Sequence, residues 1–177
     1  MNVICFGDSN TYGYDPRGYF GGRYEADNRW VNILSAATGW TIRNLGQNGR
    51  EIPYSSLAFP SDTDLLIVML GTNDLLQGRN PEQAAGRLER FLSGVSMDRS
   101  KVLLIAPPPV TLGAWVSSPQ LIDDSCTFAR LCQALAERMG IRFADAGRWD
   151  ISLAYDGVHF TEQGHKAFAA GLLEELK

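Results

Sequence analysis

The chain has 177 residues, of which 45% are hydrophobic and 20% are charged, and its formal net charge is −4. This size and composition are typical of one globular domain with its own hydrophobic core, so we expect a single domain over residues 1–177. An acidic chain without a basic stripe argues against nucleic acid as a partner, and no apolar stretch is long enough to span a membrane.

Five short apolar runs predict β-strands. In chain order they cover residues 3–6, 41–45, 64–70, 101–106 and 141–144. The run Asp64–Leu70 gives the strongest signal, because its apolar residues follow one another without alternation, as in a strand buried on both faces. Three consecutive prolines at 107–109 end the fourth strand, since proline cannot donate a ladder hydrogen bond.

Four segments with apolar residues at helical spacing predict α-helices. In chain order they cover residues 27–38, 81–92, 120–139 and 161–176. We expect Asp27 to cap the first helix and Gly39 to end it in the left-handed conformation. Pro81 suits the first turn of the second helix, and Thr161 with Glu162 can cap the last one.

The alternation of strands and helices predicts an α/β fold. We expect a three-layer α/β/α sandwich with a five-stranded parallel, flavodoxin-like sheet. Ligands of such sheets bind beyond the carboxyl ends of the strands. The polar residues that directly follow a strand are therefore the candidates for a functional site.

Ser9 is the first candidate, because Gly7-Asp8-Ser9 follows the first predicted strand. A serine hydroxyl needs a base to take its proton, and that base is nearly always histidine. The chain has only two histidines. Asp156 precedes His159 by three residues and can fix its tautomer, whereas we expect His165, inside the last helix, to be partly exposed and without a catalytic role. Taken alone, a serine after a strand more often caps a turn.

Two further segments follow strands. Gly46 comes after the second strand, where the absence of a side chain lets a backbone N–H approach a ligand, as an oxyanion hole requires. Asn73 lies in Gly71-Thr72-Asn73-Asp74 after the third strand and can point its amide at a developing oxyanion. The alternatives are a turn with positive φ at Gly46 and an Asx turn at Asn73.

Together these segments resemble the SGNH hydrolases, also called GDSL-type esterases and lipases, over the whole chain. The family pattern is Gly-Asp-Ser near the N-terminus, a glycine after the second strand, Gly-x-Asn-Asp after the third and Asp-x-x-His near the end. The matching segments of this chain are Gly7-Asp8-Ser9, Gly46, Gly71-Thr72-Asn73-Asp74 and Asp156-Gly157-Val158-His159. Bacterial arylesterase/acyltransferase-type members are the most similar.

The resemblance implies a serine esterase that works through an acyl-Ser9 intermediate. It implies His159 as the base and Asp156 as the residue that orients it. The oxyanion hole would consist of the Ser9 N–H, the Gly46 N–H and the Asn73 side chain. Asn10 departs from the pattern, because the family commonly has leucine after the serine, and this difference argues against a lipase-like apolar neighbourhood.

The substrate is expected to be a small ester with a short acyl chain, such as an acetyl ester of an aryl or sugar alcohol. The segment Tyr12–Tyr24 is rich in aromatic residues and glycine, which suits a pocket wall or a lid. An ordered surface loop or a contact in a homo-oligomer explains it equally well. The candidate substrate-binding residues are Asp8, Asn10, Tyr14, Trp115 and Tyr155.

Other readings stay open at this point. A thioesterase or lysophospholipase would use the same residues, and a non-catalytic relative that binds carbohydrate would share the fold. The three cysteines show no metal-ligand spacing, and an odd number without a basic signal segment indicates reduced thiols in a cytoplasmic protein. We expect neither a metal nor a cofactor, and no membrane partner.

Overall fold

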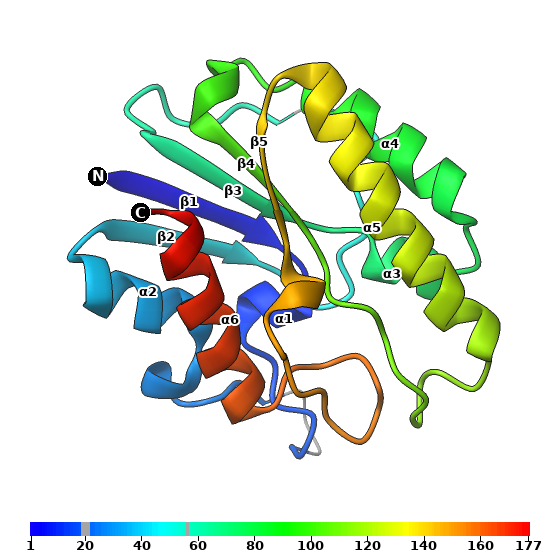
Figure 1. The fold of residues 1–177 in the computed structure, drawn as a ribbon. Coiled ribbons are helices and arrows are strands. Elements are labelled where there is room, and N and C mark those ends of the chain that lie inside the picture. Colours follow the sequence, from blue (N-terminus) through cyan, green and yellow to red (C-terminus); the bar gives the residue numbers. More distant parts are fainter. Residues whose placement is uncertain (19–21, 56) are drawn as a thin grey trace.

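The computed structural model describes residues 1–18, 22–55 and 57–177 (Figure 1). Residues 19–21 of the predicted lid segment Tyr12–Tyr24 lie outside the described residues. The role of that segment as a lid or as a subunit contact therefore stays a prediction.

A five-stranded sheet forms the centre of the molecule, and all its neighbouring strands are parallel. In chain order the strands are β1 (Asn2–Gly7), β2 (Thr41–Gly46), β3 (Leu65–Met69), β4 (Val102–Ala106) and β5 (Arg142–Asp145). Their order across the sheet is β2-β1-β3-β4-β5. The predicted parallel sheet is confirmed, and each strand begins and ends within about one residue of its apolar run.

Two pairs of longer helices cover the two faces of the sheet, which confirms the three layers (Figure 1). They are α2 (Trp30–Thr38) with α6 (Glu162–Glu175) on one face, and α4 (Pro81–Ser93) with α5 (Pro119–Met139) on the other. Successive residues of β1 serve both layers, because Val3 packs toward α2 and α6 whereas Ile4 packs toward α4 and α5. This two-sided burial explains why the strands show no polar alternation.

The predicted helix ends are partly right. Gly39 ends α2 in the left-handed conformation, with φ +69°, and the Thr161 side chain caps α6 by accepting from the Gly164 N–H. Asp27 does not cap α2: it lies in a separate 3₁₀ turn, η1 (Ala26–Asn28). The helix begins three residues later than predicted, since Trp30 enters the core as its first residue.

The spacing of apolar residues in the sequence did not predict two one-turn helices. They are α1 (Ser9–Tyr12), directly after β1, and α3 (Thr72–Leu76), shortly after β3. The Asp8 side chain caps α1 by accepting from the Asn10 N–H, and Gly13 ends it with φ +90°. Both helices lie at the carboxyl edge of the sheet, and each carries a residue of the predicted site.

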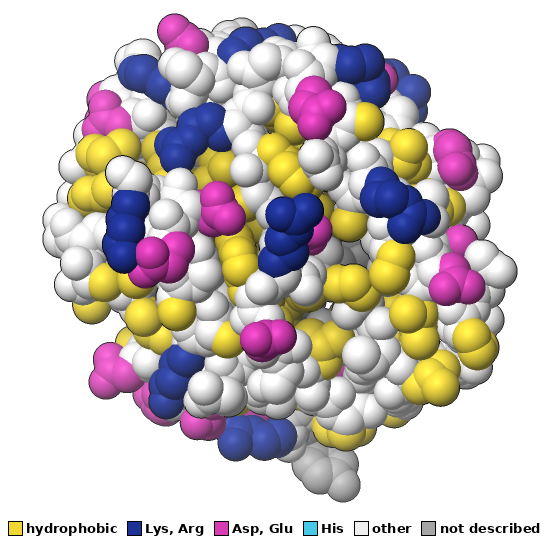
Figure 2. Space-filling model, viewed as in Figure 1, with side chains coloured by type: hydrophobic (Ala, Val, Ile, Leu, Met, Phe, Trp, Pro, Cys, Tyr) yellow, Lys and Arg dark blue, Asp and Glu magenta, His cyan; other side chains and the backbone are white. Residues whose placement is uncertain are grey.

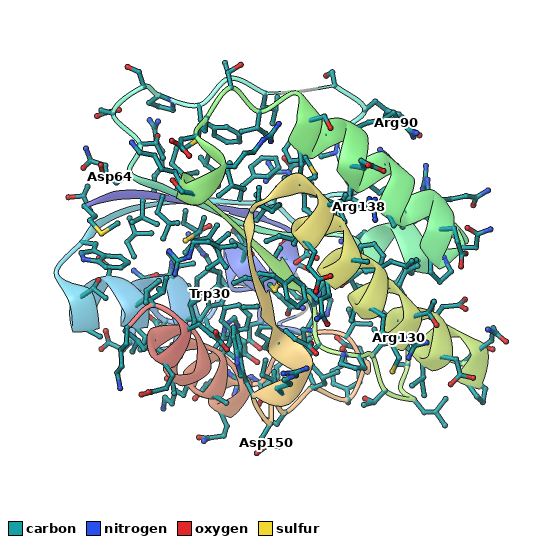
Figure 3. The ribbon with its side chains drawn as sticks, turned by 45° about the horizontal axis from the view of Figure 1, so that its top comes forward. Trp30, Asp64, Arg90, Arg130, Arg138 and Asp150 are labelled. Atoms are coloured by element: carbon teal, nitrogen blue, oxygen red, sulfur yellow. The ribbon has the colours of Figure 1, made fainter. Side chains whose placement is uncertain are left out.

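Basic and acidic side chains are interspersed on the face shown in Figure 2. Figure 3 shows Arg90, Arg130 and Arg138 pointing outward from α4 and α5, whereas Trp30 lies inside, beside α2 and α6. None of the helices in the described ranges combines the length and the apolar character that crossing a membrane requires.

Candidate active site

The carboxyl ends of three neighbouring strands meet at the predicted site. Gly7 at the end of β1 is paired with Gly46 of β2 on one side and with Met69 of β3 on the other. The chain turns into α1 immediately after Gly7, so Ser9 becomes the first residue of a helix at this edge. The carboxyl edge of a parallel sheet is where ligands of this fold class bind.

Ser9, His159 and Asp156 form one hydrogen-bonded line. Ser9 Oγ lies 3.0 Å from His159 Nε2, and His159 Nδ1 lies 2.7 Å from Asp156 Oδ2. All three side chains are buried or nearly so. The two ends of the chain, which the sequence suggested would meet, therefore lie within proton-transfer distance of each other.

Asp156 is held as a carboxylate by its hydrogen bonds. Its Oδ1 accepts from the backbone N–H groups of Val158 and His159, both at 2.9 Å. Burial raises the pKa of this carboxyl, but the hydrogen bonds from His159 and Val158 outweigh burial, and the pKa lies below its usual value. An ionised Asp156 accepts the Nδ1–H of His159, which leaves Nε2 free to accept the Ser9 proton.

The loop that carries Asp156 and His159 is braced by the segment 111–116. Backbone N–H groups of that segment donate to this loop: Thr111 to Gly157 at 2.9 Å, Ala114 to Tyr155 at 3.1 Å and Trp115 to Asp156 at 3.0 Å. Gly157 has φ +81°, and a Cβ at this position would overlap the Thr111 carbonyl oxygen. The spacing of Asp156 and His159 therefore depends on a glycine between them.

Two of the three predicted oxyanion donors have an N–H hydrogen without an acceptor among the described residues. The Ser9 N–H is the first of helix α1, and the first N–H groups of a helix have no acceptor inside the helix. The Asn73 side chain donates through Nδ2 to the Arg50 carbonyl at 3.1 Å, which uses one of its two amide hydrogens. The other hydrogen has no acceptor in the part of the chain that the structure describes.

The predicted role of Gly46 needs correction. Its N–H donates to Asn44 Oδ1 at 2.8 Å and is therefore occupied. A Cβ on Gly46 would overlap the Tyr12 backbone nitrogen, so the glycine is required because α1 packs closely against this strand end. Gly49, in the turn that follows, has φ +70° and an open side-chain position, and it precedes the residue that accepts from Asn73.

A buried ion-pair cluster, which the sequence analysis missed, anchors the turn after β2 to α3. Asp74 is fully buried and accepts from Arg87 Nη1 at 2.9 Å and from the Ile52 N–H at 2.9 Å. Glu51 pairs with Arg87 at 2.8 Å and with Arg79 at 2.7 Å. Burial raises the pKa of Asp74 in spite of these arginines. The only hint of this cluster in the sequence is Asp74 itself, because its partners Ile52 and Arg87 are distant in sequence.

Two predicted aromatic residues lie against the histidine. The ring centroid of Tyr14 is 4.5 Å from that of His159, and the ring of Trp115 stands edge-on to it at 4.9 Å. Trp115 is half exposed, so it borders both the imidazole and solvent. Tyr155 lies farther out: it is 67% exposed, and its hydroxyl donates to the Pro16 carbonyl at 3.1 Å.

The predicted substrate contacts of Asp8 and Asn10 stay predictions, and both side chains are buried and accept hydrogen bonds from backbone groups of the protein. Asp8 caps α1, and burial raises its pKa to about 6. Asn10 uses both ends of its amide in hydrogen bonds to the loop around His159.

His165 is fully buried, so the expected partial exposure was wrong. The inward face of α6 carries it together with Phe168, and its ring packs edge-on against Tyr24 and Phe160, at 5.3 Å from each. Burial, followed by the nearby Arg29 charge, lowers its pKa to about 3. Among the residues that the structure describes, no three His, Cys, Asp or Glu side chains are grouped as metal ligands.

Comparison with known proteins adds to this geometry. The model of the GDSL-like Lipase/Acylhydrolase family matches residues 5–167. A putative arylesterase from Agrobacterium tumefaciens is 28% identical, with a TM-score of 0.83 and coverage of 99% of this chain and 98% of that one. A carbohydrate acetylesterase family member from Sinorhizobium meliloti is 25% identical, with a TM-score of 0.83 and coverage of 99% and 97%.

The aryl esterase of M. smegmatis is also similar, with 27% identity, a TM-score of 0.81 and coverage of 99% of this chain and 98% of that one. A comparison with the curated proteins gives no significant match.

Proposed function

This chain belongs to the GDSL-like lipase/acylhydrolase family and is a carboxylic ester hydrolase, and on that premise we propose that Ser9 is its nucleophile. The observation that carries the proposal is the line of hydrogen bonds from Ser9 Oγ through His159 to Asp156. Histidine activates serine in this arrangement, and the carboxylate orients the histidine.

The reaction proceeds by acyl transfer. His159 Nε2 takes the proton of Ser9 while Oγ attacks the ester carbonyl carbon, and Asp156 stabilises the imidazolium. The imidazolium then gives its proton to the leaving alcohol, and the acyl group stays on Ser9. His159 next removes a proton from water as the water oxygen attacks the acyl-Ser9 carbonyl carbon, and the imidazolium returns that proton to Ser9 Oγ as the C–O bond breaks and the acid leaves.

Three donors stabilise the tetrahedral oxyanion in this proposal: the Ser9 N–H, the second amide hydrogen of Asn73 and the Gly49 N–H. The last replaces Gly46, because the Gly46 N–H already donates to Asn44. The hydrogen bond from Asn73 to the Arg50 carbonyl supports Gly49, since it places the residue directly after Gly49 beside the Asn73 amide. Removing one such donor costs roughly 3 kcal/mol of transition-state stabilisation.

The substrate proposed is a short acyl ester, such as an acetyl ester of an aryl or sugar alcohol. Tyr14 and Trp115 support it, because they place aromatic surface directly against the imidazole. The names of two similar structures, an arylesterase and a carbohydrate acetylesterase, agree with this class. A thioesterase is the second candidate, since it would use the same catalytic groups. A cytosolic location is proposed with it, supported by the free thiols of Cys5, Cys126 and Cys132.

Replacing Ser9 with alanine tests the proposal. With p-nitrophenyl acetate we expect kcat/KM to fall on the order of 10⁴-fold or more, because the nucleophile and the bond it forms are lost. Labelling by a fluorophosphonate probe should disappear in the same variant. Ser93→Ala is the matched control, because Ser93 is exposed at the end of α4.

Retained activity or retained labelling in Ser9→Ala would remove Ser9 from the mechanism. A wild-type protein that neither hydrolyses the ester nor reacts with the probe would favour a non-catalytic relative. Activity that is greatest on acyl chains longer than octanoate would contradict the short-chain assignment.

A further inference from the structure

Asn10, the residue after Ser9, brackets His159 with its side-chain amide. Its Nδ2 donates to the Val158 carbonyl at 3.1 Å, and its Oδ1 accepts from the Phe160 N–H at 2.9 Å. These two backbone groups belong to the residues immediately before and after His159. One side chain therefore fixes the peptide groups on both sides of the imidazole.

The two hydrogen bonds of the Asn10 side chain are formed between buried residues. Asn10, Val158, His159 and Phe160 are all buried. Buried hydrogen bonds to backbone groups hold position well, because breaking one leaves a desolvated donor or acceptor without a partner. The bond between Ser9 Oγ and His159 Nε2 runs beside them, so two consecutive residues of α1 contact three consecutive residues of the histidine loop.

The backbone of Asn10 is itself anchored in the core. Trp30 Nε1 donates to the Asn10 carbonyl at 3.0 Å. Trp30 is the buried first residue of α2, and its ring centroid lies 4.6 Å from that of Phe168 in α6. Hydrogen bonds thus connect Trp30, in the layer of α2 and α6, to Asn10, and Asn10 to the backbone on both sides of His159.

The remaining backbone contacts of the histidine loop have a different effect. The Ala154 N–H donates to the His159 carbonyl at 2.7 Å, and Trp115 and Thr111 donate to residues 156 and 157. These bonds hold the shape of the loop and its place beside the segment 111–116. The bonds of Asn10 connect the loop to the helix that carries the nucleophile.

We propose that Asn10 is a positioning residue for acyl transfer, which sets the distance between Ser9 Oγ and His159 Nε2 by clamping residues 158 and 160 to α1. This inference rests on the proposed function. Leucine branches at Cγ as asparagine does but can make neither bond. In this chain it would leave the Val158 carbonyl and the Phe160 N–H unpaired.

The test compares Asn10→Leu with the wild type. We expect kcat to fall roughly 10- to 100-fold with KM close to the wild-type value, because a small displacement of the base slows the chemical step and leaves the substrate-binding surface intact. Fluorophosphonate labelling of Ser9 should slow in parallel. Hydrogen exchange of the Phe160 amide should become faster, since its acceptor is gone.

Asn80→Leu is the control, because it makes the same substitution at an asparagine whose side chain accepts from the Gln83 N–H in the capping box of α4. Losing that cap lowers Tm and should leave kcat unchanged. Asn10→Asp is the second variant. It keeps the acceptor for Phe160 and loses the donor to Val158, so its kcat should lie between those of Asn10→Leu and the wild type.

The possible results separate the two proposals. A wild-type kcat in Asn10→Leu, with or without faster exchange at Phe160, overturns the proposal that Asn10 positions His159. If Asn10→Leu does not fold, a wild-type kcat in Asn10→Asp overturns it instead. A fall in kcat of the same size in Asn80→Leu would also overturn it, because the loss would then follow stability alone. A wild-type protein without esterase activity and without probe labelling would refute the proposed function itself.

Discussion

Burial of Asp8, the residue before Ser9, disfavours the ionised form of its carboxyl group. Its side chain is 2% exposed, and burial raises its pKa from 3.8 to about 6, although the Asn10 N–H, His159 and Arg50 all favour the ionised form. The folded state therefore binds a proton more tightly than the unfolded state. The stability that protonated Asp8 contributes is fully present below pH 3.8 and is lost as the pH rises through about 6.

We expect Asp8→Asn to stabilise the protein at pH 8, because asparagine keeps the oxygen that caps α1 and carries no charge. A shift of about two pKa units corresponds to roughly 3 kcal/mol at most. The advantage should disappear at pH 3.5 to 4, where Asp8 is protonated in the folded wild type. Urea unfolding of both proteins at the two pH values measures it, and an Asp8→Asn protein of equal or lower stability at pH 8 would contradict it.

The residues next to Ser9 show where sequence reasoning stops. The motifs predicted which side chains meet, because Ser9, Asp156 and His159 each follow a strand or precede the last helix. They did not predict that Asp8 caps a helix or that Asn10 bonds to the histidine loop, because a single helical turn after β1 leaves no periodic signal.

At the scale of elements, the loop 153–160 and the segment 111–116 act as one unit at the edge of the sheet. Backbone hydrogen bonds pair the two segments, and this pairing requires Gly157 to approach Thr111 closely. The pairing is short and irregular, and it involves residues about 45 positions apart, so the sequence pattern contains no sign of it.

Gly157→Ala should disrupt the pairing of the loop 153–160 with the segment 111–116. The alanine would need a strained φ of +81° and would overlap the Thr111 carbonyl oxygen, so Asp156 and His159 would be displaced. We expect esterase kcat to fall on the order of 100-fold or more, together with a lower Tm.

Gly39→Ala provides the comparison, because Gly39 has a similar φ of +69° but open space around it, at the far end of α2. It should cost about 1 kcal/mol of stability with no change in kcat. Equal kcat values for Gly157→Ala and the wild type would show that the catalytic spacing does not depend on this glycine.

Helices and strands of different lengths differ in how well the sequence predicts them. The five strands and the longer helices were predicted closely, because their apolar residues repeat over several positions. The start of α2 was placed too early, since Asp27 has the right chemistry for a cap but the core position of Trp30 sets the helix start. Local preference was overridden by packing.

At the scale of the whole molecule, the site is assembled from opposite ends of the chain. Ser9 and Asn10 follow β1, whereas Asp156 and His159 precede α6, and 150 positions separate the serine from the histidine. β1 lies inside the sheet, between β2 and β3, and α6 packs beside α2 on one face. The proton-transfer geometry therefore exists only when the first and the last parts of the chain are both folded.

This assembly predicts that the reactivity of Ser9 and the fold are lost together. In a urea titration, the rate of fluorophosphonate labelling should fall in the same transition as the change in tryptophan fluorescence, because Trp30 is buried in the layer that supports Asn10. Loss of labelling at a clearly lower urea concentration would mean that the site opens before the molecule unfolds, and would contradict a fully coupled assembly.

The burial of the second imidazole has a practical consequence for spectroscopy. The chain contains only two histidines, and one of them, His165, stays uncharged over the whole neutral range because its pKa is lowered to about 3. The His165 ring resonances should therefore show no titration in nuclear magnetic resonance spectra across that range.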